Sequence, residues 1–153
     1  MSLSAWRLVR AEQTDHAFDG EGARLYGGRW NPPGVPTIYA AGSRALAALE
    51  VLVHLPRALR GGAFVLHRVE FDEQAVEVID PASLPADWSV YPPPSSSQAL
   101  GQAWLARASK PVLRVPSVLL PEESNFLLNP RHPAFAALRL QRERFFFFDP
   151  RLG

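Results

Sequence analysis

An arginine, a tyrosine and a glutamate that could act on one substrate stand close together between Gly20 and His54. Arg29 follows two glycines, and Tyr39 and Glu50 lie in the two apolar runs that come next. A guanidinium holds an anion through its fork of donors, a tyrosine contacts a ring or donates its hydroxyl, and a carboxylate stabilises developing positive charge. This combination is unusual for a purely structural segment and predicts an active site.

The turn that carries Arg29 is the first part of this prediction. Gly27 and Gly28 allow the backbone to pass close to a ligand, and backbone N–H groups beside a guanidinium form an anion cradle. Trp30 offers a flat face to a ring, and the following Asn31-Pro32-Pro33-Gly34 run predicts a rigid turn. The alternative is an ordinary glycine turn with a surface arginine.

The helix that carries Glu50 is the second part. Ser43 stands where an N-cap is expected, and residues 44–55 are almost entirely apolar, which predicts a buried helix. Glu50 projects from its apolar surface, where an unpaired charge costs several kcal/mol. It is therefore either half of a structural ion pair or a catalytic carboxylate, and the nearby arginine turn favours catalysis.

Other elements must position these groups. Strands are expected at 5–11, 37–41, 63–71, 75–79, 112–120 and 145–148, helices at 44–55, 98–108 and 133–141, and loops at 14–24 and 81–97. The run 145–148 is four phenylalanines, apolar on both faces, and predicts a central strand. Because strands and helices mix without βαβ alternation, the sequence predicts one α+β domain over residues 1–153.

Three polar residues outside the segment are further candidates. Ser117 shares the apolar face of its strand, so its hydroxyl needs a partner, and we expect a polar contact to substrate. Arg7 lies on the opposite face from its apolar neighbours, where the alternative is a solvated arginine. Asn129 precedes a proline in a turn and offers a side-chain amide to a ligand. No metal-binding or acyl-nucleophile motif is present, so no metal site is expected.

Composition excludes several classes of protein. The chain has 153 residues, no cysteine and a formal net charge of +1. The length and the absence of cysteine suit one domain without disulfides, and the small net charge gives no basis for nucleic-acid binding. No signal segment and no apolar run of membrane-spanning length is present, so we expect no membrane contact, and the composition is compatible with a protein of the cytoplasm.

The order of several motifs resembles a known family, the RES domain, which is the toxin half of RES–Xre toxin–antitoxin modules. The resemblance begins with the run GEGARLYGGRWNPPGVPTIYAAGSRALAALEVLVH and continues through Val115-Pro116-Ser117, Asn125-Phe126-Leu127-Leu128-Asn129-Pro130 and Phe147-Phe148-Asp149-Pro150-Arg151-Leu152. It covers nearly the whole chain in the right order, which is more specific than any single motif.

The resemblance implies a compact fold similar to ADP-ribosyltransferases and an enzyme that cleaves the nicotinamide–ribose bond of NAD, its substrate, with no further cofactor. It implies catalytic roles for Arg29, Tyr39 and Glu50. The implied contacts to NAD are Arg7, Gly28, Trp30, Asn31, Ser117 and Asn129.

The resemblance also implies partners and leaves alternatives open. An Xre-type helix-turn-helix antitoxin is expected to bind the protein, with a homodimer inside that complex as one expected assembly. The acceptor is water (a glycohydrolase), phosphate (a phosphorylase) or a protein side chain (an ADP-ribosyltransferase). The alternatives without chemistry are a nucleotide-binding module and a protein-interaction subunit.

Overall fold

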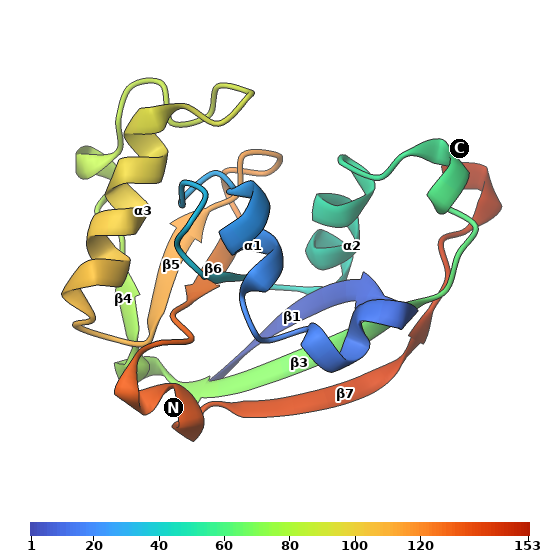
Figure 1. Cartoon of the computed structure of the whole chain (residues 1–153), viewed down its shortest axis with the longest axis horizontal. Coiled ribbons are helices and arrows are strands. Elements are labelled where there is room, and N and C mark those ends of the chain that lie inside the picture. The colour runs from blue at the N-terminus through green and yellow to red at the C-terminus, as the bar shows by residue number, and fades with distance from the viewer.

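The computed structural model describes residues 1–153, which form one seven-stranded mixed sheet with helices packed on it (Figure 1). The strands are β1 Ser2–Arg10, β2 Ile38–Ala41, β3 Phe64–Asp72, β4 Val76–Val78, β5 Val112–Pro116, β6 Ser124–Leu128 and β7 Arg139–Phe146. The α-helices are α1 Glu21–Tyr26, α2 Arg44–Leu52 and α3 Ser95–Arg107, and none is long and apolar enough to cross a membrane.

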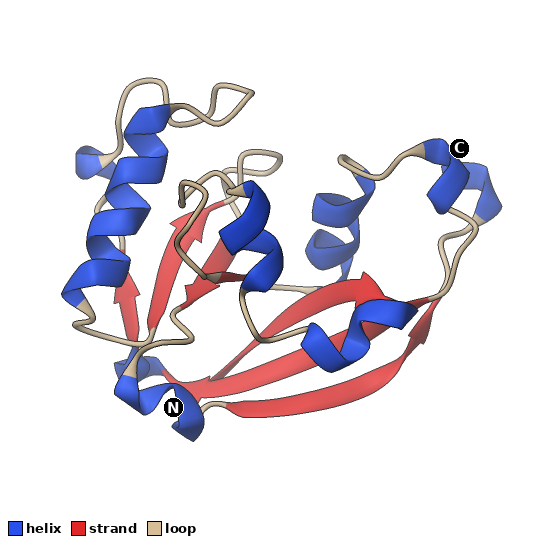
Figure 2. Ribbon diagram, viewed as in Figure 1, coloured by secondary structure: helices blue, strands red, loops and turns tan.

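The strand order is β4-β5-β6-β2-β1-β3-β7, and every neighbouring pair is antiparallel except β4–β5. Mostly antiparallel strands with helices outside any βαβ repeat confirm the predicted α+β class. Strand β1 pairs with β3 along its whole length, but it pairs with β2 only at Trp6↔Ala41. The sheet therefore opens between β1 and β2, and Figure 2 shows α1 and α2 on the same side of this junction.

Helix α2 begins where the sequence predicts and is less buried than predicted. The Ser43 hydroxyl oxygen accepts a hydrogen bond from the Leu46 backbone N–H at 3.1 Å, the expected N-cap. The helix ends at Leu52 rather than at residue 55. Leu49 is 39% exposed and Val53 is 54% exposed, so the prediction of an interior helix is wrong for one side.

Helix α3 supports the turn that carries Arg29. The Ser97 hydroxyl donates to the Arg29 carbonyl oxygen at 2.7 Å, and Gln98 Nε2 donates to the Gly28 carbonyl oxygen at 3.0 Å. At Gly101 the turn lies so close that an added Cβ would meet the Trp30 carbonyl oxygen at 1.8 Å. The small residue lets α3 pack directly on the backbone of the turn.

Substitution of Gly101 by alanine should destabilise the protein, although alanine is the better helix former. The clashing atoms are backbone atoms of Trp30 and cannot rotate away, so the helix must move off the turn at a cost of about 3 kcal/mol. Chemical unfolding measures the loss. Gly61→Ala is the matched control, because nothing lies within 4 Å of its added Cβ. Equal stability of the two variants would contradict this packing.

Three local predictions are wrong. The expected loop 14–24 contains the end of a 3₁₀ turn, Ala11–His16, and the start of α1. The expected helix 133–141 is a 3₁₀ turn, Pro133–Ala137, that leads into β7. The expected central strand 145–148 includes only the last two residues of β7, which is an edge strand, and Phe145 and Phe147 are 54% and 63% exposed.

Strand β7 pairs with β3 alone, so it forms an edge of the sheet, and a bulge in that pairing sets which of its side chains face the core. A β-bulge lies between the β3 pairs of Arg144 and Arg142, and it changes which residues of β7 face each side. Phe146 and Phe148 then pack edge-to-face with ring centroids 4.9 Å apart, and Phe148 contacts Phe64 in the same way at 5.1 Å. Half of the aromatic run is therefore core, and the other half is surface.

Candidate active site

Two adjoining cavities, of about 750 and 220 Å³, lie at the opening of the sheet. The residues that line both are Tyr39, Glu50, His54, Tyr91, Pro93 and Asn125. Glu50 is the only acidic residue in either lining, whereas Arg7 and Arg10 line the larger cavity and Arg29 lines the smaller. This charge distribution suits an anionic ligand that presents one cationic or electron-poor centre to Glu50.

Glu50 is held through a single carboxylate oxygen. Its Oε1 accepts hydrogen bonds from the Ser117 hydroxyl at 2.7 Å and from Asn125 Nδ2 at 2.8 Å. Its Oε2 accepts no hydrogen bond from the protein, and no arginine, lysine or histidine forms a salt bridge with it. The structural ion pair is therefore excluded, and the carboxylate is fixed in orientation with one oxygen left for a ligand.

Ser117 forms a hydrogen bond with the Glu50 carboxylate and does not line a cavity. It is completely buried, and its hydroxyl oxygen accepts from the backbone N–H groups of Leu119 at 3.1 Å and Leu120 at 3.2 Å. These bonds orient the hydroxyl so that its proton goes to Glu50. Ser117 lines neither cavity, so the partner that the sequence required is Glu50 rather than the expected substrate.

Asn125 is a site residue that the sequence reasoning missed. It lies in β6 opposite Ala41 of β2, next to the start of α2, and it lines both cavities. Its Nδ2 donates to Glu50, while its Oδ1 is buried without a hydrogen-bond partner. The motif that contains Asn125 was visible in the sequence, but its contact with Glu50 spans 75 positions.

Tyr39 presents its ring to the cavities and its hydroxyl to the protein. The hydroxyl donates to Asn31 Oδ1 at 2.5 Å and accepts from the Trp30 backbone N–H at 3.1 Å. Burial raises the pKa of Tyr39, against the opposing effects of the Trp30 N–H and the Arg29 charge, so the phenol stays protonated at neutral pH. Its hydroxyl is thus part of the scaffold and is not free to donate to a ligand.

Arg29 connects the smaller cavity to the loop at residues 88–90. Its Nη1 donates to the carbonyl oxygens of Trp88 at 2.8 Å and Val90 at 2.7 Å, while Nε and Nη2 donate to no protein acceptor. Burial lowers the pKa of Arg29, and the nearby Glu50 carboxylate opposes this change. No carboxylate forms a salt bridge with the guanidinium, so two of its nitrogens are available to an anion.

Arg7 supplies a second, more deeply buried cation. Its Nε donates to the Ala17 carbonyl oxygen at 2.6 Å, and its Nη1 donates to the Tyr39 carbonyl oxygen at 3.0 Å. Burial lowers the pKa of Arg7 to about 10, with Asp19 opposing the change, so the side chain remains charged at neutral pH. Neutral carbonyl groups fix this charge in the wall of the larger cavity without cancelling it.

The remaining predicted contacts divide between the cavity wall and the scaffold. Gly28 lines the larger cavity, and a Cβ there would lie 2.7 Å from the Tyr39 hydroxyl. Trp30 lines the smaller cavity but is only 2% exposed, and it stacks on Trp88 with ring centroids 6.1 Å apart. The face expected to hold a ligand ring is therefore occupied by Trp88.

Asn31 and Asn129 line neither cavity. The Asn31 amide nitrogen donates to the carbonyl oxygens of Ala23, Pro32 and Val35, which closes the turn around Tyr39. The Asn129 amide donates to the Leu105 carbonyl oxygen and accepts from the Arg131 N–H. Both buried amides are satisfied within the protein, which explains why polar residues occupy these positions without a ligand.

Comparisons with known proteins identify the family of this chain. A family described as RES domain matches residues 4–149. The chain is 38% identical over 161 residues to the Prs ADP-ribosylating toxin of Sphingobium sp. (strain YBL2), covering 99% of this chain and 98% of that protein. It is also 38% identical over 151 residues to Toxin Res of Yersinia enterocolitica, covering 98% and 99%.

A solved structure, that of the M. tuberculosis MbcT-MbcA toxin-antitoxin complex, contains a chain with a similar fold. The TM-score is 0.73 at 25% identity, and the match covers 99% of this chain and 87% of that chain. The family match extends over almost all of the sequence, from Ser4 near the start of β1 to Asp149 after β7. The chain therefore belongs to the RES domain family.

Proposed function

We propose that this protein is the toxin of a toxin–antitoxin pair and that it cleaves the nicotinamide–ribose bond of NAD. The observation that carries the proposal is the arrangement of Glu50, a lone carboxylate held by two neutral donors at the junction of two arginine-lined cavities. The names of the relatives, which are toxins and in one case an ADP-ribosylating toxin, support the same reading.

The site contributes to the reaction by stabilising positive charge on the ribose, and it does not need to protonate the leaving group. As the C1′–N bond breaks, its electron pair moves to the nicotinamide nitrogen, and the ribose gains oxocarbenium character. Glu50 Oε2, which has no partner in the protein, faces that charge, while Ser117 and Asn125 keep the carboxylate in place. Nicotinamide leaves as a neutral molecule, so no general acid is needed.

The two cavities divide the substrate between them. The smaller one, next to Trp30 and Val53, takes the nicotinamide ring, and the larger one takes the rest of the dinucleotide. Arg7 supplies positive charge to the pyrophosphate from inside the larger cavity, and Arg29 supplies it from the smaller cavity across the boundary at Glu50, a residue that both cavities share. The acceptor, which is water, phosphate or a protein side chain, then bonds to C1′ and releases its proton.

The second candidate function is ADP-ribosyl transfer to a protein side chain. The ADP-ribosylating relative, which matches over 98% of its own length, favours it. Glu50 has the same role in both reactions, since both pass through the same cationic ribose. A nucleotide-binding module without chemistry is disfavoured, because such a module gains nothing from a carboxylate with a free oxygen beside anion-binding arginines.

The proposal extends to partners and to the compartment. The similarity to a chain solved with its antitoxin supports an antitoxin for this protein as well. We expect that antitoxin to be of the Xre helix-turn-helix type and to cover the cavities, with two copies of the toxin in the complex. The site of action would be the cytoplasm, where the NAD pool is accessible.

Expression in bacteria without an antitoxin tests the proposal. We expect the cellular NAD pool to fall and growth to stop, and we expect neither effect from the Glu50→Gln variant at equal protein level. Growth arrest with an intact NAD pool and ADP-ribose on a cellular protein would select the transferase. Normal growth with an intact NAD pool would show that the protein is not an NAD-consuming enzyme.

A further inference from the structure

The aromatic residues around the cavities differ in how their rings are used. The five that line one or both cavities are Trp6, Tyr26, Trp30, Tyr39 and Tyr91. Arg44 and Arg68 lie over the Trp6 ring at 4.8 and 6.0 Å, and Trp30 stacks on Trp88. The Tyr39 hydroxyl has two partners, and the Tyr91 ring lies 5.9 Å from His54. Only Tyr26 has no ring partner and no side-chain hydrogen bond.

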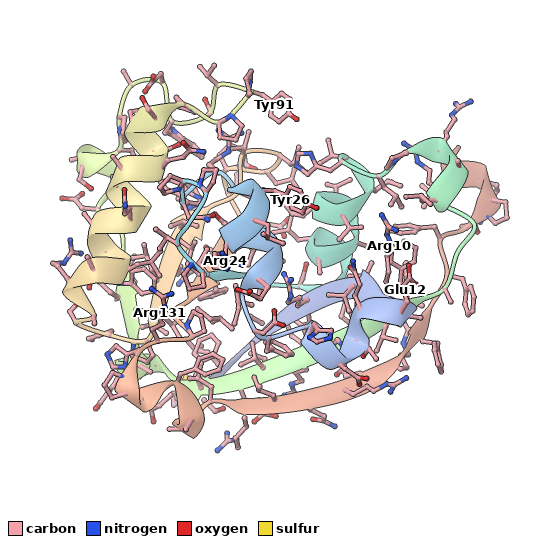
Figure 3. All side chains as sticks on the ribbon, in the orientation of Figure 1. Arg10, Glu12, Arg24, Tyr26, Tyr91 and Arg131 are labelled. Carbon is pink, nitrogen blue, oxygen red and sulfur yellow. The ribbon has the colours of Figure 1, made fainter.

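Tyr26 is held in position although its side chain is free. It is the last residue of α1, and Gly27 follows with a φ of 73°, a conformation that glycine adopts without strain. The Gly27 N–H donates to the Ala23 carbonyl oxygen at 2.8 Å and closes the helix. Tyr26 is 83% exposed and nevertheless lines the larger cavity, and Figure 3 shows its ring projecting from α1 toward α2.

The position of Tyr26 along the site is informative. It lines the larger cavity only, as do Arg7, Arg10 and Gln13, whereas Glu50 lies where the two cavities meet. A dinucleotide that presents its reacting bond to Glu50 and one ring to the smaller cavity must place its second ring in the larger cavity. A free aromatic face at the mouth of that cavity is where a second ring can stack.

We propose that Tyr26 is the stacking platform for the adenine ring of the substrate, and that it makes the site select a dinucleotide over a mononucleotide. This inference rests on the proposed function for the identity of the ligand and adds a specificity-determining residue to it. Every nucleobase presents a π-face, and stacking on an aromatic side chain holds it without requiring hydrogen bonds to its edges. The absence of any partner for the Tyr26 ring leaves that face available.

Binding of two half-substrates tests the inference independently of cleavage. ADP carries the adenine ring and a pyrophosphate but no nicotinamide, while nicotinamide mononucleotide carries the reacting half alone. Calorimetry should show that Tyr26→Ala weakens ADP binding on the order of 10- to 100-fold and leaves nicotinamide mononucleotide binding unchanged. Tyr26→Phe, which keeps the ring, should bind ADP like the unaltered protein.

Leu25→Ala is the matched control, because Leu25 is the neighbouring exposed residue of α1 and lines neither cavity. Three results would overturn the inference. They are an unchanged ADP affinity in Tyr26→Ala, an equal loss of affinity for both half-substrates in that variant, and no binding of ADP by the unaltered protein. The two proposals fail separately. If ADP binding depends on Tyr26 but NAD is not cleaved, the proposed function is wrong. If NAD is cleaved but Tyr26→Ala binds ADP with unchanged affinity, the adenine subsite at Tyr26 is wrong.

Discussion

Replacement of Glu50 by glutamine should reduce turnover of NAD about 100-fold or more and leave the fold almost unchanged. Glutamine keeps the size and shape of the side chain but removes the negative charge that the proposed reaction uses to stabilise the ribose. The loss should therefore appear mainly in kcat, because the charge develops on the ribose only as the bond to nicotinamide breaks. It should also abolish toxicity in cells.

The hydrogen bonds of Glu50 explain why stability should survive. The Ser117 hydroxyl and Asn125 Nδ2 are neutral donors to one oxygen, and the glutamine carbonyl oxygen accepts both bonds in the same way. If an arginine paired with Glu50, the same substitution would leave a buried charge alone and cost about 3–5 kcal/mol. The structure contains no such pair, so a small change in melting temperature is expected.

Thermal unfolding and nicotinamide release, measured on the same preparation, check this prediction. Glu143→Gln is the matched control, because it removes a carboxylate that pairs with Arg44 of α2 and lines neither cavity. That control should keep its turnover. A large drop in the melting temperature of Glu50→Gln with near-normal turnover would mean that Glu50 is structural.

Arg29→Lys should raise the KM for NAD about 10- to 100-fold with a smaller effect on kcat, because a hydrogen bond between charged groups contributes about 1.5–3 kcal/mol. The guanidinium serves two purposes, since Nη1 holds the carbonyl groups of Trp88 and Val90 while Nε and Nη2 remain for an anion. A lysine ammonium is a single point charge, so it cannot bind the carbonyl groups of the loop at residues 88–90 and the pyrophosphate at the same time.

Steady-state kinetics with NAD measures the effect of Arg29→Lys. Arg107→Lys provides the comparison, because Arg107 pairs with Glu77 on the surface of α3, away from both cavities. If Arg29→Lys has the KM and kcat of the unaltered protein, Arg29 is an ordinary surface arginine of the turn and does not bind the substrate. A folded variant with raised KM would place the guanidinium in the anion site.

Local patterns predicted the elements that carry the site. The position of Ser43 before an apolar run is enough to fix the start of α2, and the alternation around Ser117 is enough to place its hydroxyl on the buried face. The sequence also identified Arg7, Gly28, Arg29, Tyr39 and Glu50, all of which line a cavity. The placements of Ser43 and Ser117 depend only on neighbours along the chain, whereas the candidacy of Arg7 also depends on the resemblance to the RES domain.

The features that escaped prediction depend on distant parts of the chain. Glu50 meets Ser117 and Asn125 across 67 and 75 positions, and periodicity within a segment does not say which segment pairs with it. From the sequence, the amide of Asn31 is expected to be available to a ligand. In the structure it forms hydrogen bonds with the Tyr39 hydroxyl and with three backbone carbonyl groups. The position of β7 at the edge of the sheet, and the bulge within its pairing to β3, likewise leave no mark in an unbroken run of phenylalanines.

The most direct test of the account is to incubate the purified, antitoxin-free protein with NAD and to quantify free nicotinamide by chromatography. We predict that nicotinamide accumulates with time, that NAD disappears in equal amount, and that Glu50→Gln protein at the same concentration releases almost none. If NAD stays intact with the unaltered protein in the presence of water, of phosphate and of a cell extract as source of protein acceptors, then the cavities around Glu50 do not cleave NAD.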